Sequence, residues 1–345
     1  MKKQVQRVLG IAMLLFSSFI TVSAQEALSY LESASLSQKD ISQRYMSYVS
    51  AVSHGKSARK VEKRRISLLE TVQQARNQAE ILPPFKGDRA LKDALVNYLG
   101  IMFNILNEDY GKIVNLEDIA EQSYDNMEAY FMAQDMANKK QDIAYKKYDS
   151  IYEDFAKKNN ITLISKESEL SLKLKQANAV NSYYHALYLM FFKSYKQDFY
   201  LSDAINKNNV SGIEQNKNTL VKYANETITK LDTMRAFEDD RTLIMACRDL
   251  MQFYVEEGSK MQIYTEFLLK NENFAKMSKA FNSKPDRQRT QADVDTYNKG
   301  VNEINALTNT YNKTNQELNN KRAKYINGWN DAVSRFLDNH VPKYK

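Results

Sequence analysis

The sequence is poor in the residues that make turns and crosslinks. Its 345 residues include 9 glycines, 4 prolines and one cysteine, against 22 tyrosines and an apolar fraction of 43%. A sheet-rich domain needs many turns, so this composition favours long helices instead. The lone cysteine, Cys247, excludes an internal disulfide, and we expect its thiol to be a small buried apolar group.

The patterns of the common catalytic and metal-binding sites are also missing. None of the three histidines follows a glutamate by three residues, and no H-E-x-x-H motif or EF-hand loop occurs. No G-x-G-x-x-G, Walker A or G-x-S-x-G motif is present either. We therefore expect no catalytic residue, no metal and no cofactor, although an enzyme built from scattered carboxylates stays open.

The N-terminus carries an apolar run that is too short for a comfortable membrane span. Basic residues precede an apolar stretch over 8–20, and the small residues Val22 and Ala24 place the expected cleavage before Gln25. This pattern predicts a Sec-type signal peptide over 1–24. Because no cysteine follows the cleavage point, we expect no lipid anchor through cysteine. The mature chain is expected in the periplasm or on the cell surface, with no transmembrane segment.

The charge is mild except in one segment. Net charge is +7, and removal of 1–24, which holds three basic and no acidic residues, leaves +4; this does not point to nucleic acid. The segment HGKSARKVEKRR over 54–65 contains a single acid, Glu62. On a helix starting near Ser57 its basic side chains would form either a solvated face or a patch for anionic lipid, phosphate or glycan. These residues are Lys56, Arg59, Lys60, Lys63, Arg64 and Arg65.

The frame F-x-x-D-R-x-L occurs twice, at 85–91 and 237–243, a shift of 152 residues. The segment before each frame carries apolar residues at regular spacing, and a shift of 152 residues makes the apolar positions of the two segments coincide. Each segment has one basic residue at the same position of this pattern, Arg65 in the first and Lys217 in the second. A spacing of three and four residues puts one stripe of a helix against its partners. The sequence therefore predicts a duplicated unit.

The expected fold is all-α, a duplicated elongated bundle of two similar four-helix units over 25–163 and 164–345. Proline pairs and asparagine-rich segments mark the breaks between helices. The expected helices are 27–53, 57–82, 88–107 and 116–159 in the first unit, and 167–206, 210–234, 240–281 and 291–340 in the second.

The repeated frame predicts a corner that starts the third helix of each unit. Its aspartate would accept hydrogen bonds from free backbone N–H groups at the N-cap or first turn. Its phenylalanine would fix the entry of the chain, and its arginine would pair with an acid on a neighbouring helix. We expect these residues to be structural: Phe85, Asp88, Arg89, Phe237, Asp240 and Arg241.

An aromatic segment, YYHALYLMFFKSYKQDFYL over 183–201, surrounds its helix on nearly all sides. A helix that is apolar all round is normally buried, here at a junction between the two copies. The alternative is a groove for a partner helix or a sugar ring. The residues concerned are Tyr184, Tyr188, Phe191, Phe192, Tyr195 and Phe199.

The segments RRISLLETVQQA, LPPFKGDRALKDALVNYL and NEDYGKIVNLEDIAEQSYDNMEAYFMAQDMANKKQD resemble an uncharacterised family of exported bacterial surface proteins from Bacteroidetes and leptospires. The resemblance is most specific over 64–142. It implies an all-helical fold in a Gram-negative type of envelope and carries over no site residues. We expect a noncatalytic protein that binds a protein or an envelope polymer. A glycan hydrolase or lyase, with carboxylates in a groove between the units, and a self-assembling homo-oligomeric scaffold are the alternatives.

Overall fold

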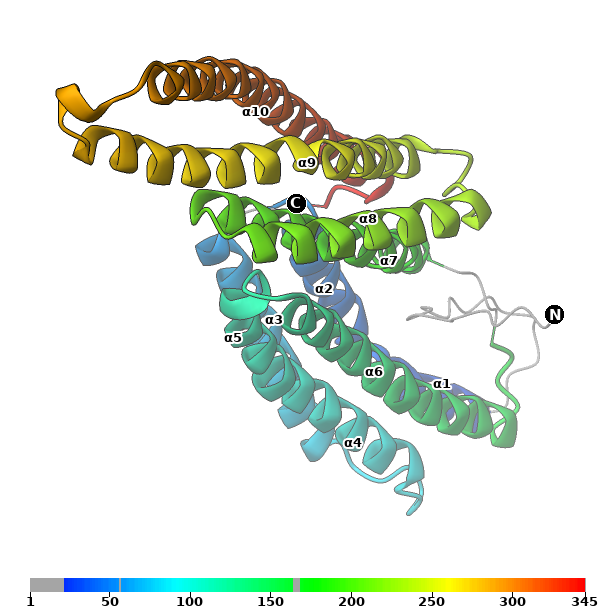
Figure 1. The fold of residues 1–345 in the computed structure, drawn as a ribbon. Helices are drawn as coiled ribbons and strands as arrows, with labels where there is room; N and C mark the ends of the chain where they lie inside the picture. Colours follow the sequence, from blue (N-terminus) through cyan, green and yellow to red (C-terminus); the bar gives the residue numbers. More distant parts are fainter. Residues whose placement is uncertain (1–21, 56, 164–167, 345) are drawn as a thin grey trace. The chain divides into compact units, whose positions relative to one another are not determined.

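The structure, a computed structural model, describes residues 22–55, 57–163 and 168–344. The expected signal peptide lies almost wholly outside these residues. The described residues are all-α, as predicted, and contain no β-strand (Figure 1). The chain divides into two compact units: unit 1 runs to His185 and takes in Arg335–Lys345, and unit 2 is Ala186–Ser334. The boundary predicted at 163/164 concerns the sequence repeat and stays a prediction.

Unit 1 is an antiparallel helical bundle in which α3 packs between α2 and α4, and α6 packs on α4 and α5. The end of the chain also belongs to it, since Val341 is buried and the Tyr344 backbone N donates to Ser50 Oγ at 3.1 Å. Its helices are α1 (Val22–Ser35), α2 (Gln38–Ser53), α3 (Ala58–Ile81), α4 (Ala90–Asn104), the π-helical turn η1 (Ile105–Asp109), α5 (Tyr110–Ala120) and α6 (Tyr124–Lys158).

Three expected features of unit 1 were wrong. The helix expected over 116–159 is divided between α5 and α6 by a break at 121–123. The helix expected over 27–53 is divided between α1 and α2, where the Ser37 hydroxyl donates to Gln78 Oε1 at 2.9 Å. The turn expected at 107–111 is instead a π-helical turn that continues into α5. Arg65 Nη1 donates to the Leu106 carbonyl in this turn at 2.5 Å, which gives the irregular backbone a partner.

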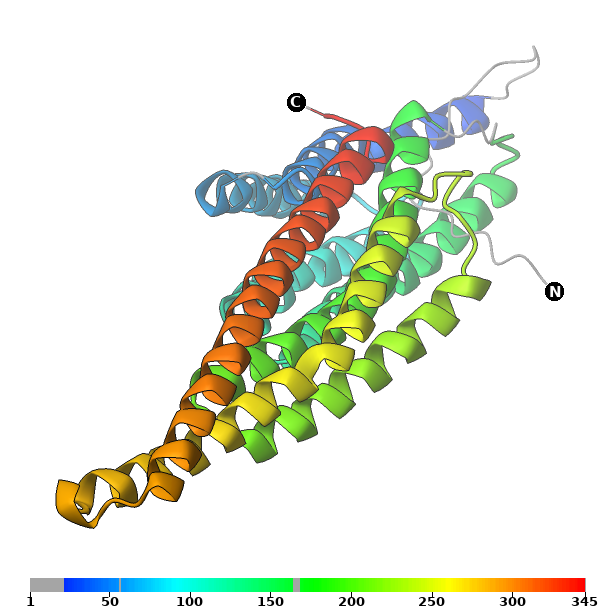
Figure 2. The ribbon, with the colours of Figure 1, turned by 45° about the horizontal axis from the view of Figure 1, so that its top comes forward.

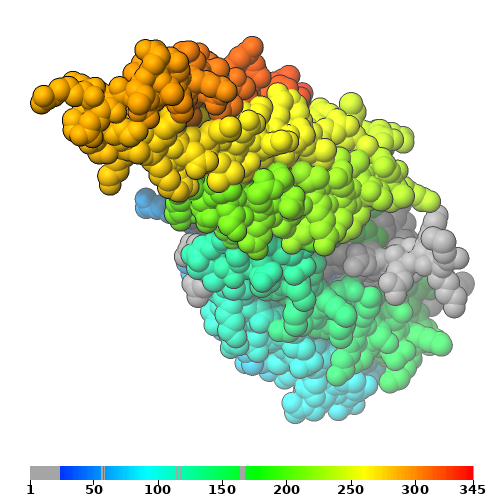
Figure 3. All heavy atoms as spheres, viewed as in Figure 1, coloured from blue at the N-terminus to red at the C-terminus, as the bar shows by residue number. Residues whose placement is uncertain are grey.

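Unit 2 is formed by the second part of α7 (Glu169–Asn206), together with α8 (Val210–Thr233), α9 (Thr242–Ser283) and most of α10 (Gln291–His340). Helices α8, α9 and the first half of α10 lie side by side, in green, yellow and orange (Figures 1, 2 and 3). The core contains Leu220, Leu231, Tyr254 and Trp329, all at most 1% exposed. The apolar spacing predicted for α8 and α10 is therefore buried.

The two expected repeats share local structure at matching positions. Helices α3 and α8 are both 24 residues long, and both their ends differ by the shift of 152 residues. Helices α4 and α9 start at Ala90 and Thr242, which differ by the same shift. Helix α9 then runs on without the π-helical turn that follows α4. The tandem duplication itself stays a prediction.

The two corners are tight turns of the same form. Phe85 and Asp88 exchange backbone hydrogen bonds of 3.0 and 2.8 Å around Lys86 and Gly87, both at positive φ. Around Glu238 and Asp239, also at positive φ, Phe237 and Asp240 exchange hydrogen bonds of 3.3 and 2.8 Å. Positive φ at both central residues is the geometry of a type I′ turn.

The aspartate of each corner starts the next helix. Asp88 Oδ1 accepts from the Ala90 N–H at 2.8 Å, and Asp240 Oδ1 accepts from the Thr242 N–H at 2.7 Å. The N-cap residues are the following arginines, Arg89 and Arg241. Arg89 was expected to pair with an acid on a neighbouring helix, but it pairs with Asp93 at the start of its own helix. Four residues is the spacing at which side chains meet along one face of a helix.

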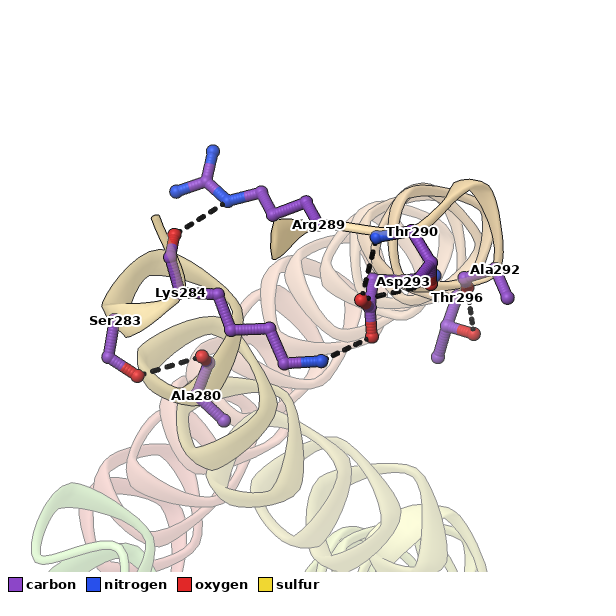
Figure 4. Close-up of polar contacts among 8 residues, drawn as sticks. All are labelled: Ala280, Ser283, Lys284, Arg289, Thr290, Ala292, Asp293 and Thr296. Carbon is purple, nitrogen blue, oxygen red and sulfur yellow. Dashed lines mark hydrogen bonds and ion pairs between the residues drawn. The ribbon is translucent and has the colours of Figure 1, made fainter. Parts of the chain in front are cut away.

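The turn between α9 and α10 is held by polar contacts around Asp293 (Figure 4). The Thr290 N–H donates to Asp293 Oδ2 at 2.9 Å, and the Asp293 N–H donates to Thr290 Oγ1 at 3.2 Å. This reciprocal arrangement is a capping box, which satisfies free N–H groups at the start of α10. Lys284 Nζ also donates to Asp293 at 2.7 Å, and these hydrogen bonds lower the pKa of Asp293 to about 2.

We predict opposite effects from alanine at two helical glycines of unit 2. A Cβ at Gly258 would lie 2.2 Å from Val221 Cγ2 on α8, whereas one at Gly328 would meet nothing within 4 Å. Gly258→Ala should lower the free energy of unfolding by about 1–3 kcal/mol through overpacking. Gly328→Ala should raise it by up to about 1 kcal/mol, because alanine favours the helix. Urea unfolding followed by circular dichroism measures both; equal effects would contradict the close approach of α8 to α9.

Candidate functional site

The basic segment at the start of α3 divides into two groups. Arg64 Nη1 donates to the Ser47 carbonyl at 2.6 Å, and Arg65 pairs with Glu62 while it donates to Leu106. These two guanidinium groups hold α3 against α2 and against the π-helical turn. Lys56 lies outside the described residues. Arg59, Lys60 and Lys63 are exposed and, in the part of the chain that the structure describes, form no ion pair.

The first turns of α3 are electrostatically unfavourable as they stand. The N-cap Ser57 makes no side-chain capping hydrogen bond, and the first turn contains no acidic residue. Positive side chains at the positive end of a helix dipole are destabilising. Helix α8 is different, because its N-cap Asn209 accepts from the Gly212 N–H and its matching first-turn positions are the uncharged Ser211 and Gly212.

The aromatic segment lies on α7 and crosses the boundary between the two units. Tyr184 belongs to unit 1, and the other five residues belong to unit 2. Phe191 and Phe192 are buried, and the Phe191 ring stacks on Trp329 of α10 with centroids 4.5 Å apart. Phe199 is 59% exposed, with Lys196 Nζ 4.9 Å from its ring centroid. The ring contacts thus place part of the segment in the core of unit 2, and its role as a junction stays a prediction.

An ionic cluster in the core of unit 2 was not predicted from the sequence. It joins Asp198 of α7, Glu257 of α9 and Arg322 of α10. Arg322 Nε donates to both Asp198 oxygens at 3.2 Å, and its Nη2 donates to Glu257 Oε1. Asp198 is 3% exposed and Glu257 is 0% exposed. One arginine therefore faces two buried carboxyl groups.

Burial changes the acidity of both carboxyl groups. It raises the pKa of Glu257 to about 9, with a further increase from the nearby Asp198 and an opposing decrease from Arg322. The pKa of Asp198 is also raised by burial, against the lowering effect of Arg322. Loss of hydration and a second negative charge both disfavour the ionised form.

The sequence contains a signal for this cluster. Glu257 continues the spacing of buried Leu250, Tyr254, Met261 and Tyr264 on α9. Arg322 likewise interrupts the apolar spacing of α10 between the buried Leu318 and Trp329. Charged residues of opposite sign at inward positions of different helices indicate a buried ion pair, but their pairing depends on the order in which the helices pack.

The cluster does not have the arrangement required by the glycan-hydrolase alternative. Two catalytic carboxyl groups must flank a substrate at a separation of about 5–9 Å. Asp198 and Glu257 are instead both buried and are bridged by the single guanidinium group of Arg322. Among the described residues, no group of three or more histidine, cysteine or acidic side chains is placed to hold a metal ion.

The described helices also include none that combines the length and the apolar run needed to cross a membrane. Comparison of the chain with protein-family models, curated proteins and solved structures found no match.

We predict a large difference between two adjacent basic residues of α10. Lys321 pairs with Glu256 at the surface at 2.6 Å, whereas Arg322 compensates the buried carboxyl groups. Arg322→Met should lower the free energy of unfolding of unit 2 by about 3–5 kcal/mol, because it leaves buried charge without a partner. Lys321→Met should lower it by about 0–1 kcal/mol.

Trp329 is the only tryptophan, and it lies in the core of unit 2. Denaturant unfolding followed by its fluorescence therefore measures both variants. Similar losses of stability would show that Arg322 has no special role.

Proposed function

We propose that the protein is an exported, noncatalytic helical protein of the periplasm or cell surface. It binds an anionic polymer of the envelope through the first turns of α3. The observation that carries this proposal is the group of three exposed basic residues, Arg59, Lys60 and Lys63, at an uncapped helix N-terminus. Phosphate, sulfate or carboxylate groups on a polymer chain are the chemistry that this surface fits.

The argument rests on the cost of leaving these charges without a partner. A basic side chain in the first turn, such as Arg59 or Lys60, destabilises the helix by about 0.3–1 kcal/mol. Lys63, in the next turn, repels both of them, since it lies three and four positions away. A bound polyanion converts this repulsion into attraction. The binding surface excludes Arg64 and Arg65, because both already hydrogen-bond within unit 1.

Charge removal tests the surface directly. We expect R59Q/K60Q/K63Q to weaken binding to dextran sulfate by roughly 10- to 100-fold, since each basic residue near an anionic surface contributes about 1 kcal/mol. The matched control is K147Q/K157Q/K158Q, which removes three exposed charges from α6 of the same unit. Affinity is measured by titration at several salt concentrations. Equal losses in the two variants, or affinity independent of salt, would remove α3 as the binding surface.

Export has a separate test. The signal-peptide pattern predicts that the mature chain begins at Gln25. N-terminal sequencing of the protein from the envelope fraction should find this residue, and protease treatment of intact cells should separate surface exposure from the periplasm. Retention of residues 1–24 in the envelope fraction would contradict cleavage.

A further inference from the structure

One buried oxygen atom in the core of unit 2 has no visible hydrogen-bond donor. Glu257 Oε2 is buried and accepts no hydrogen bond from any described residue, although Oε1 of the same carboxyl accepts from Arg322. An ionised carboxylate needs donors at both oxygens, and a buried oxygen without one is strongly destabilising. A protonated carboxyl is different, because its O–H is itself a donor and needs an acceptor.

The acceptor lies beside it. The carboxyl groups of Asp198 and Glu257 accept from two nitrogens, Nε and Nη2, of the same Arg322 guanidinium group, which places them side by side. Asp198 is the better candidate for the ionised partner, because both of its oxygens accept from Arg322 Nε. A carboxyl–carboxylate hydrogen bond would therefore satisfy the orphaned oxygen of Glu257.

The charge balance points the same way. The groups that face the carboxyl pair are Tyr254 and Tyr264 of α9 and Arg322 of α10. Lys217 of α8 reaches the neighbouring Gly258 with its side-chain stem, but its ammonium pairs with Glu214. Arg322 thus supplies the single positive charge to the pair. Two ionised acids would leave one buried negative charge uncompensated, whereas one proton makes the cluster neutral.

We propose that Glu257 holds a proton at neutral pH and donates it to Asp198, so that this proton is a bound ligand of the core of unit 2. Its loss to solvent base would place two carboxylates side by side under one arginine. Proton release is thereby linked to loosening of α7 from α9 and α10 within unit 2. Burial raises the pKa of the Glu257 carboxyl, which agrees with a proton held at this position.

The linkage has a definite sign. A group with a higher pKa in the folded state binds more protons when folded, so its stabilising contribution is complete at low pH and is lost as pH rises. For Glu257 the loss extends from its ordinary pKa of 4.5 to the folded value of about 9. Within this window the folding equilibrium constant of unit 2 should fall by up to about tenfold per pH unit through this group.

Infrared spectroscopy tests the proton without any substitution. The wild-type protein containing isotope-labelled glutamate should show, at pH 7, a protonated-carboxyl stretching band that shifts with the label. The band should disappear in Glu257→Gln and persist in Glu266→Gln, which removes an exposed carboxylate from the same helix. Absence of a glutamate-derived band in the wild-type protein would overturn the proposal, whether or not the variants fold.

Unfolding as a function of pH tests the linkage. Glutamine is a close mimic of a protonated glutamate, since its amide can donate to Asp198 while its oxygen accepts from Arg322. Glu257→Gln should therefore remove up to a tenfold change per pH unit from the unfolding equilibrium reported by Trp329 fluorescence, and Glu266→Gln should retain it. The same pH dependence in the wild-type protein and Glu257→Gln would show that no linked proton is held there.

Discussion

A charged side chain can occupy an inward position of a packed helix only if a neighbouring group compensates it. Three side chains among the described residues illustrate this constraint. Arg65 on α3 has Glu62 and the Leu106 carbonyl, Lys217 on α8 has Glu214, and Arg322 on α10 has two carboxyl groups from other helices. The Arg65–Glu62 and Lys217–Glu214 pairs are local, with the partners three positions apart along one helix. The third joins three helices and fixes which of their faces meet.

Positions that match under the shift of 152 residues show how the same local start can lead to different cores. Arg65 reaches a carbonyl in the π-helical turn after α4, whereas α9 has no such turn and places Glu257 toward its neighbours. A long uninterrupted α9 requires all of its inward positions to be satisfied by side chains on α7, α8 and α10. At Glu257 the partners are Arg322 and the neighbouring Asp198. At Gly258 the lack of a side chain leaves room for Val221 of α8.

The surface offers less information than the core. Three basic residues at the start of α3 are exposed and form no ion pair with any described residue, and the local helix dipole makes their position unfavourable. This is the physical basis for an anionic partner. The aromatic segment, which looked like a second candidate in the sequence, places Phe191 and Phe192 in the core and leaves Phe199 exposed beside Lys196.

The sequence by itself determined the all-α class, most helix boundaries and the repeated corner, because these depend on residue spacing and on local turn chemistry. The corner aspartates find their hydrogen-bond donors two residues away. Tertiary structure decided the partners of Arg64, Arg65 and Arg322, since the groups that they contact are 17, 41 and 124 residues away. Such contacts depend on which helices pack together. The spacing of residues along one helix shows which face is buried, but it does not specify which helix covers that face.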